Sequence, residues 1–196
     1  MRDNGFSLME VICILALIAF LAVFAVPSLL KLYYQSDLNT NAVALFSEMK
    51  SIKYDAIAKN YAIGIIFYAV AGKWYYLEAQ DGNQNGIRLQ DISDGIDPVI
   101  KGPVECSSES QTADVGVIDW SVPRIPPDTG YLDPSNPVQF GDSAIFSCSP
   151  SGTCSPGTLY LMSTRLDEMR ALRVFGPTAK FTLWRYSRDK GWVVRW

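Results

Sequence analysis

The chain has 196 residues, with 17 basic and 20 acidic side chains, and its net charge is -3. It contains no histidine, which excludes Ser-His-Asp and Cys-His nucleophilic sites and every zinc site with an imidazole ligand. The apolar fraction is 48% but the mean hydropathy is only +0.08, which indicates one concentrated apolar segment and favours a membrane-attached protein that is not an enzyme.

The first element is an apolar run over residues 11–30, in which Ser28 is the only polar side chain. A run of this length, at about 1.5 Å per residue, matches the roughly 30 Å hydrocarbon core and predicts a membrane span. Residues 31–35 read KLYYQ and offer no small-residue cleavage site of a secretory signal. Arg2, on the short N-terminal side, favours a cytoplasmic N-terminus.

A second helical pattern follows the span. Six apolar residues recur at spacings of 4, 3, 4, 3 and 4, namely Leu38, Ala42, Leu45, Met49, Ile52 and Ala56. A stripe of fewer than three heptads favours packing on a sheet of the same chain over a free coiled coil. We therefore expect one helix, with a membrane part over 6–30 and an amphipathic part over 31–60.

The period then changes and predicts a β-rich head over residues 61–196. Residues 62–70 and 73–78 are predicted as a hairpin. Four more strands are predicted at 158–162, 170–174, 180–185 and 191–196. Residues 98–156 hold 9 of the 11 prolines and predict an irregular, surface-exposed insertion with at most short strands. The predicted fold class is α+β, a long N-terminal helix packed on a mainly antiparallel sheet.

Oxygen-bearing side chains alternate in the segment after the hairpin and resemble the start of a calcium loop. The candidate ligands are Asp81, Asn83, Asn85, the Ile87 carbonyl and either Asp91 or Asp94. The alternative is a plain turn, because Asp-Gly and Asn-Gly are common tight-turn pairs and Ile92 stands where a calcium loop has its glutamate. Calcium is the only cofactor that the sequence suggests.

Three of the four cysteines lie beyond the membrane span, on the side where disulfides persist. Cys148 and Cys154 frame a five-residue loop, and a bridge between them is favoured over one to Cys106. Either pairing leaves one of these three cysteines as a free thiol. Cys13 lies in the apolar run and is expected to behave as a small apolar residue.

Charge is segregated along the head. Residues 78–143 hold 12 acidic and 3 basic side chains, whereas residues 165–196 hold 8 basic and 3 acidic ones. Basic residues interleaved with aromatic ones are typical of a nucleic-acid track. The candidate DNA-binding residues are Lys180, Arg185, Arg188 and Lys190. The favoured interpretation is that the basic strands pair with the acidic insertion or with a neighbouring subunit.

The start of the chain resembles the processing signal of type IV prepilins and type II secretion pseudopilins. Residues 5–11 read GFSLMEV, a glycine, an aromatic residue and a glutamate ahead of the apolar run. The resemblance implies that residues 1–5 are a leader, which a prepilin peptidase removes by cutting after Gly5. Phe6 then becomes the N-methylated first residue of the mature chain.

Two further positions fit the same family. Glu10 stands where the family has its glutamate, whose carboxylate pairs with the ammonium of a neighbouring subunit and sets the axial register of packed helices. Pro27 matches a proline that bends or locally melts these helices.

The C-terminal block resembles the heads of the GspH/FimT group of minor pseudopilins and minor pilins. The matching segments are 157–161, 170–174 and 176–180, together with Phe146 and the Ser-Pro-Ser-Gly-Thr cluster over 149–153. The chain departs from the group at Ala179 and Lys180, where many relatives have Gly-Arg. Lysine keeps the positive charge there but loses the bidentate guanidinium.

The resemblance implies a minor subunit of a type II secretion pseudopilus or a type IV pilus. Such a subunit is held in the bacterial inner membrane by one span, with its head in the periplasm, until it is assembled into a periplasmic or surface filament. Its partners are then other pilin subunits and the prepilin peptidase. An alternative is a FimT-like minor pilin that binds DNA for natural transformation. Secretion and pilus subunits share these motifs, so both machines stay open.

Overall fold

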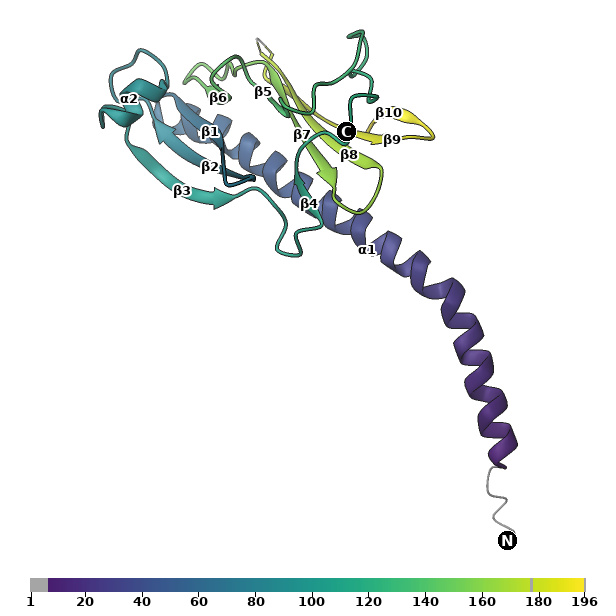
Figure 1. The fold of residues 1–196 in the computed structure, drawn as a ribbon. Helices are drawn as coiled ribbons and strands as arrows, with labels where there is room; N and C mark the ends of the chain where they lie inside the picture. Colours follow the sequence, from purple (N-terminus) through teal and green to yellow (C-terminus); the bar gives the residue numbers. More distant parts are fainter. Residues whose placement is uncertain (1–6, 177, 196) are drawn as a thin grey trace.

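The computed structural model describes residues 7–176 and 178–195 and shows one long helix beside a β-rich head (Figure 1). Helix α1 (Leu8–Lys59) has 52 residues and is therefore about 78 Å long. It ends at Asn60, whose φ of 59° is the left-handed conformation common after a helix. The N-terminal half of α1 projects from the head and the C-terminal half runs along it. The prediction of a single long helix is confirmed.

The described strands form two antiparallel sheets. The first has the order β3-β2-β1-β6, and the second has the order β10-β9-β8-β7-β4 with β5 also paired to β7. A short helix, α2 (Leu89–Ser93), lies between β2 and β3. The strands are β1 Ile63–Val70, β2 Lys73–Gln80, β3 Val99–Glu105, β4 Ala113–Val115, β5 Val138–Gln139, β6 Ile145–Cys148, β7 Gly157–Ser163, β8 Glu168–Phe175, β9 Lys180–Ser187 and β10 Gly191–Val194. The α+β class is confirmed.

The amphipathic half of α1 is the spine of the head. Its buried residues are Leu38, Ala42, Leu45, Phe46, Met49, Ile52 and Ala56, which include all six of the predicted stripe. They share one hydrophobic core with apolar side chains from both sheets, such as Ile65 of β1 and Leu172 of β8. The helix therefore holds the two sheets together by contacting each of them.

Local signals predicted the hairpins well. Val70 of β1 pairs with Lys73 of β2, and Ala71 and Gly72 between them both have positive φ, as a two-residue turn that matches strand twist requires. The four C-terminal strands β7 to β10 enclose the predicted segments, apart from the last two residues of 191–196. Strand β10 ends at Val194, and Trp196 lies outside the described residues.

The insertion over 98–156 differs from the prediction of an exposed segment with at most short strands. Its first part is β3, a seven-residue strand paired with β2, and β6 pairs with β1. A second part, over 117–132, packs on the face of the second sheet that points away from α1, and its buried residues are Val117, Val122, Ile125 and Leu132. That face carries apolar side chains such as Met169 and Tyr186, which need cover from water.

Cys148 and Cys154 form a disulfide across six positions, as the loop between them predicted. The thiols of Cys13 and Cys106 are free, the first exposed and the second buried. The bridge closes the turn that follows β6 and so fixes the end of the first sheet.

Replacing both bridged cysteines by serine is expected to lower the free energy of unfolding by about 2 kcal/mol, because a short covalent loop restricts the unfolded chain. Urea unfolding of the full chain in detergent measures this. The difference between wild type and the Cys148→Ser, Cys154→Ser variant should vanish in a reducing agent. An unchanged midpoint under oxidising conditions would contradict the stabilising role.

Candidate functional site

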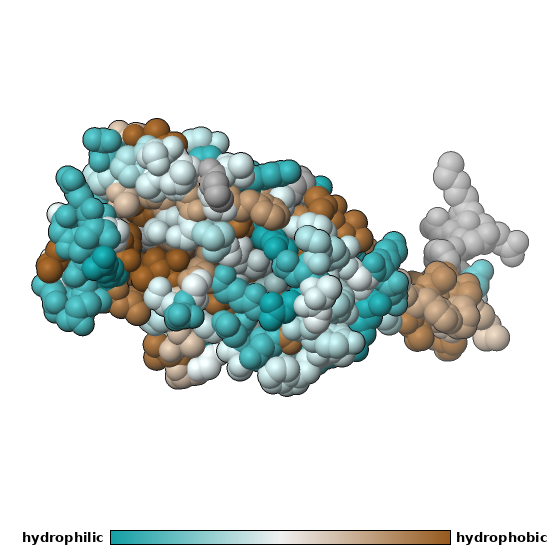
Figure 2. All heavy atoms as spheres, turned by 90° about the horizontal axis from the view of Figure 1, so that it is seen from above, coloured by the Kyte–Doolittle hydropathy of each residue, from teal (hydrophilic) through white to brown (hydrophobic). Residues whose placement is uncertain are grey.

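The N-terminal half of α1 exposes an apolar surface. Among the described residues, one helix is long and apolar enough to cross a membrane, and none of its most apolar 18-residue window is buried in the structure. Figure 2 shows this half as a hydrophobic projection beside a head whose surface is largely hydrophilic. Water is a poor environment for such a surface, so the helix fits a membrane or a bundle of similar helices.

Glu10 lies in the first turn of this apolar helix and closes a capping box with Ser7. The Ser7 backbone N–H donates to Oε2 of Glu10 at 2.8 Å, and the Met9 N–H donates to Oγ of Ser7 at 3.3 Å. In the single chain Glu10 thus stabilises its own helix start. The predicted cleavage and methylation positions, Gly5 and Phe6, lie outside the described residues.

Pro27 is the one proline inside α1. It cannot donate the backbone hydrogen bond that a helix needs at this point, and its ring opposes a straight helix. The next residue, Ser28, donates its hydroxyl to the Phe24 carbonyl at 3.3 Å, a side-chain bond that often bends a helix. Figure 1 shows α1 bending between its free half and the half on the head.

A cluster of polar side chains joins α1 to the second sheet where the apolar half ends. Its centre is Glu168 at the start of β8, which is buried. Gln35 of α1 donates to Glu168 Oε1, and Arg185 of β9 donates to both carboxylate oxygens at 3.1 and 3.2 Å. Sequence reasoning did not find this cluster. Its only local sign is an acidic residue in a basic block.

Arg170 lies behind Glu168 and is 1% exposed. Its Nη1 donates to the Met169 carbonyl at 2.9 Å and lies 3.5 Å from Glu168 Oε2, whereas Nε has no hydrogen-bond partner among the described residues. Burial lowers the pKa of Arg170 to about 10, and the nearby charges of Arg185 and Arg195 act in the same direction. Glu168 opposes that shift and is the carboxylate paired with this guanidinium.

A second ionic cluster ties the middle of α1 to the first sheet. Lys101 of β3 pairs with Glu48 of α1 and lies 3.0 Å from Oε1 of Glu78 of β2, a charge contact without hydrogen-bond alignment. Burial raises the pKa of Glu78, and its hydrogen bond to Glu48 adds to the rise. The hydrogen bond from Glu78 lowers the pKa of Glu48, an effect that Lys101 reinforces. The two carboxyl groups and one ammonium thus hold three elements together.

The four candidate DNA-binding residues lie along β9 and the turn after it, and two of them are already paired. Arg185 is bound by Glu168, while Arg188 pairs with Asp167 and with Asp119 of the insertion. Lys180 and Lys190 are exposed and make no ion pair with a described residue. Another pair, Arg173 with Asp128 at 2.7 Å, also joins a basic strand to the insertion. The pairs Arg188–Asp119 and Arg173–Asp128 thus show that two residues of the basic block pair with the acidic insertion, while pairing with a neighbouring subunit stays a prediction.

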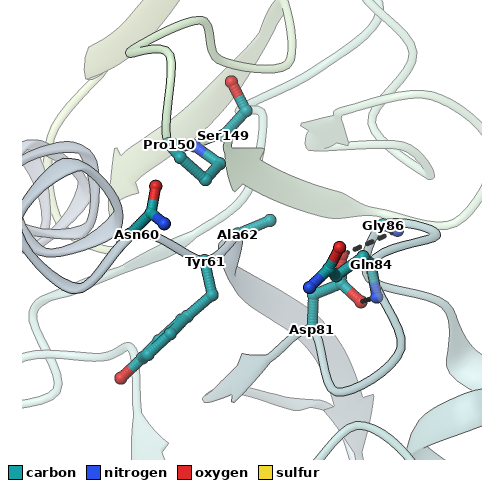
Figure 3. A pocket seen from close by; sticks show the side chains of 8 residues that line it. All are labelled: Asn60, Tyr61, Ala62, Asp81, Gln84, Gly86, Ser149 and Pro150. Atoms are coloured by element: carbon teal, nitrogen blue, oxygen red, sulfur yellow. Dashed lines mark hydrogen bonds between the residues drawn. The ribbon is translucent and has the colours of Figure 1, made fainter.

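The candidate calcium loop is held by its own backbone. Asp81 accepts amide hydrogen bonds from Asn83, Gln84 and Gly86, two of which are drawn in Figure 3. Asn83 donates its side-chain amide to Asp91 at 3.2 Å, so Asn83 turns a donor toward a predicted ligand. No group of three or more His, Cys, Asp or Glu side chains within 7–176 and 178–195 is placed to hold a metal ion. The hydrogen bonds of Asp81 fit the turn interpretation, and calcium binding by the loop stays a prediction.

The same loop lines a cavity of about 430 Å³ at the end of the head away from the apolar half of α1. Figure 3 shows Asn60 at the end of α1, Tyr61 and Ala62 after it, and Ser149 and Pro150 of the disulfide loop around this cavity. Ile87 and Ile92 of the segment pack on the outer face of the first sheet. The segment thus covers that sheet.

A long apolar helix packed on antiparallel sheets is compatible with a type IV pilin-like fold. No known family model, curated protein or solved structure matches the chain. Function is therefore inferred from the chain's own residues and contacts.

Proposed function

We propose that this chain is a non-enzymatic minor subunit of a type IV filament, a minor pilin or minor pseudopilin of the GspH/FimT type. The observation that carries the proposal is the division of α1. One half exposes apolar side chains along its length, and the other half is the buried spine of an antiparallel head. Such a chain has a surface that must be covered by lipid or by other helices, and a head that is free to contact other subunits.

Moving the apolar half of α1 from the membrane into a filament requires little desolvation of polar groups. The apolar half of α1 leaves the hydrocarbon of the inner membrane and enters a bundle of similar helices, which is again apolar. The head stays in the periplasm. Processing after Gly5 would leave Phe6 as a methylated N-terminus, and its ammonium would be the partner that Glu10 needs in apolar surroundings. Glu10 would then exchange its capping bond for a charge pair with a neighbour.

Replacing Glu10 by alanine is expected to leave membrane insertion intact and to lower incorporation into filaments. We expect a drop of at least about tenfold, because losing the partner of a charge in apolar surroundings costs more than the roughly 1.4 kcal/mol that a tenfold change represents. The amount of subunit in a purified filament fraction, relative to the amount in the membrane fraction, measures this.

A glutamine at position 10 separates the two roles of Glu10. Glutamine can still accept the Ser7 N–H bond of the capping box but carries no charge. If charge pairing drives incorporation, the incorporation of Glu10→Gln should be as low as that of Glu10→Ala. Wild-type incorporation of Glu10→Gln would reduce the role of Glu10 to helix capping, and wild-type incorporation of both variants would sink the assembly proposal.

The identity of the neighbours decides between the two machines. In-cell crosslinking from the head, followed by mass spectrometry, should recover pseudopilins if the chain serves secretion and the major pilin if it serves a pilus. The DNA-binding alternative predicts salt-dependent duplex binding by the chain, weakened by Lys180→Ala. The carboxylate pairing of Arg185 and Arg188 makes it the less favoured proposal.

A further inference from the structure

A cavity of about 360 Å³ opens beside the Glu168 cluster, where the free half of α1 meets the head. Its walls are formed by α1 on one side and by β9, β10 and the turn between them on the other. The lining residues are Lys31, Gln35, Glu168, Arg185, Ser187, Asp189, Lys190, Gly191 and Val193. The volume lies in the range of small-molecule pockets, so a small polar group can enter. We name this cavity the junction pocket.

Positive charge exceeds negative charge around the junction pocket. Three basic residues line it, namely Lys31, Arg185 and Lys190. Two carboxylates, Glu168 and Asp189, oppose these three cations. Glu168 already accepts hydrogen bonds from Gln35 and Arg185, whereas Lys31 and Lys190 make no ion pair with a described residue. The pocket is therefore suited to an anion.

The height of the pocket along α1 matches the headgroup layer. The apolar run ends at Leu30, Lys31 is the next residue, and Gln35 lies one turn further on. Tyr33 and Tyr34 follow the run, and tyrosines are enriched at membrane–water interfaces. With residues 11–30 in the hydrocarbon, the pocket meets the phosphates of the leaflet on the side of the head.

We propose that the junction pocket binds the phosphate of an anionic phospholipid, with Lys31, Arg185 and Lys190 as the cationic groups. Phosphate oxygens accept the hydrogen bonds that these groups can still donate, and Asp189 limits the excess charge. A bound headgroup would fix the head against the membrane before assembly. This inference rests on the membrane span of α1 and does not depend on filament assembly.

Lipid retention by the full chain tests the proposal. The purified protein in mild detergent is given equal amounts of phosphatidylglycerol and phosphatidylcholine, and the retained lipid is measured by native mass spectrometry. We expect preferential retention of phosphatidylglycerol and an approximately fivefold loss of it in Lys190→Gln, in line with the contribution of one lysine near an anionic surface. The matched control is Lys180→Gln, at the far end of β9, which should behave as wild type. Asp189→Asn should increase retention.

Three results would overturn the proposal. Equal retention of the two lipids would remove the need for an anionic site, and equal losses in Lys190→Gln and Lys180→Gln would indicate diffuse surface charge. Displacement of the lipid by inorganic phosphate at the same concentration would make the pocket a general anion site instead. Lys190 is exposed in a turn, so unchanged thermal unfolding of Lys190→Gln would show that any loss of lipid reflects the pocket.

Discussion

Glu168→Gln is expected to destabilise the head by about 3 kcal/mol, one of the two largest effects of any single substitution proposed for this protein. Glutamine has the shape of glutamate but no charge, so the buried guanidinium of Arg170 would lose its paired carboxylate. Removing one partner of a buried ion pair costs more than the pair itself contributes, because the remaining charge stays away from water.

The chain offers a matched control one residue away. Asp167 is exposed and pairs with exposed Arg188, so Asp167→Asn should change the stability little. Urea unfolding of the full chain in detergent compares the two variants. A second substitution sharpens the test, since Arg170→Met on the Glu168→Gln background removes the unpaired charge and should recover about half of the loss. Equal effects of the two acidic substitutions would contradict this account of the cluster.

Lys101→Met is expected to destabilise the head by about 2 kcal/mol near neutral pH, a value reduced from that of a fully buried pair because Lys101 is 44% exposed. Without the ammonium, the largely buried carboxylate of Glu78 has no countercharge, and Glu48 lies beside it with the same sign. The matched control is Lys73→Met. The partner of Lys73 is Glu105, which is exposed to water, so this substitution should lower the stability much less.

The effect of Lys101→Met should depend on pH in a defined direction. The pKa of Glu78 in the folded chain lies above its ordinary value of 4.5, so the folded state binds its proton more tightly than the unfolded state does. The stabilisation that comes from this proton is present at low pH and is lost as the pH rises through the folded pKa. Removing Lys101 raises that pKa further. The destabilisation should therefore be full at about pH 7 and smaller at about pH 4, where the raised pKa leaves Glu78 largely protonated and without need of a countercharge. An equal loss of unfolding free energy at both pH values would indicate that Lys101 stabilises the head by packing and not by its charge.

Contacts between residues close in sequence could be predicted because they follow from backbone geometry. The helical repeat places Leu38, Ala42 and Met49 on one face whatever they pack on, and all three are buried. Ala71 and Gly72 suit a two-residue turn, which sets the register of β1 and β2. The five-residue loop between Cys148 and Cys154 brings the two thiols together in the same local way. The apolar run, with Glu10 at its start and Pro27 within it, likewise predicted a membrane-spanning helix without knowledge of the fold.

Contacts between distant residues were decided by the tertiary structure alone. Gln35 and Glu168 are 133 positions apart, and nothing in the sequence around either residue points to the other. They meet because α1 crosses the second sheet at the start of β8, a consequence of how the strands are ordered. The same holds for the insertion, whose prolines indicated irregular backbone but not that its apolar residues would cover a sheet face. Periodicity and turn chemistry act within a few residues, whereas the burial of a charge or a sheet face depends on which segments the folded chain brings together.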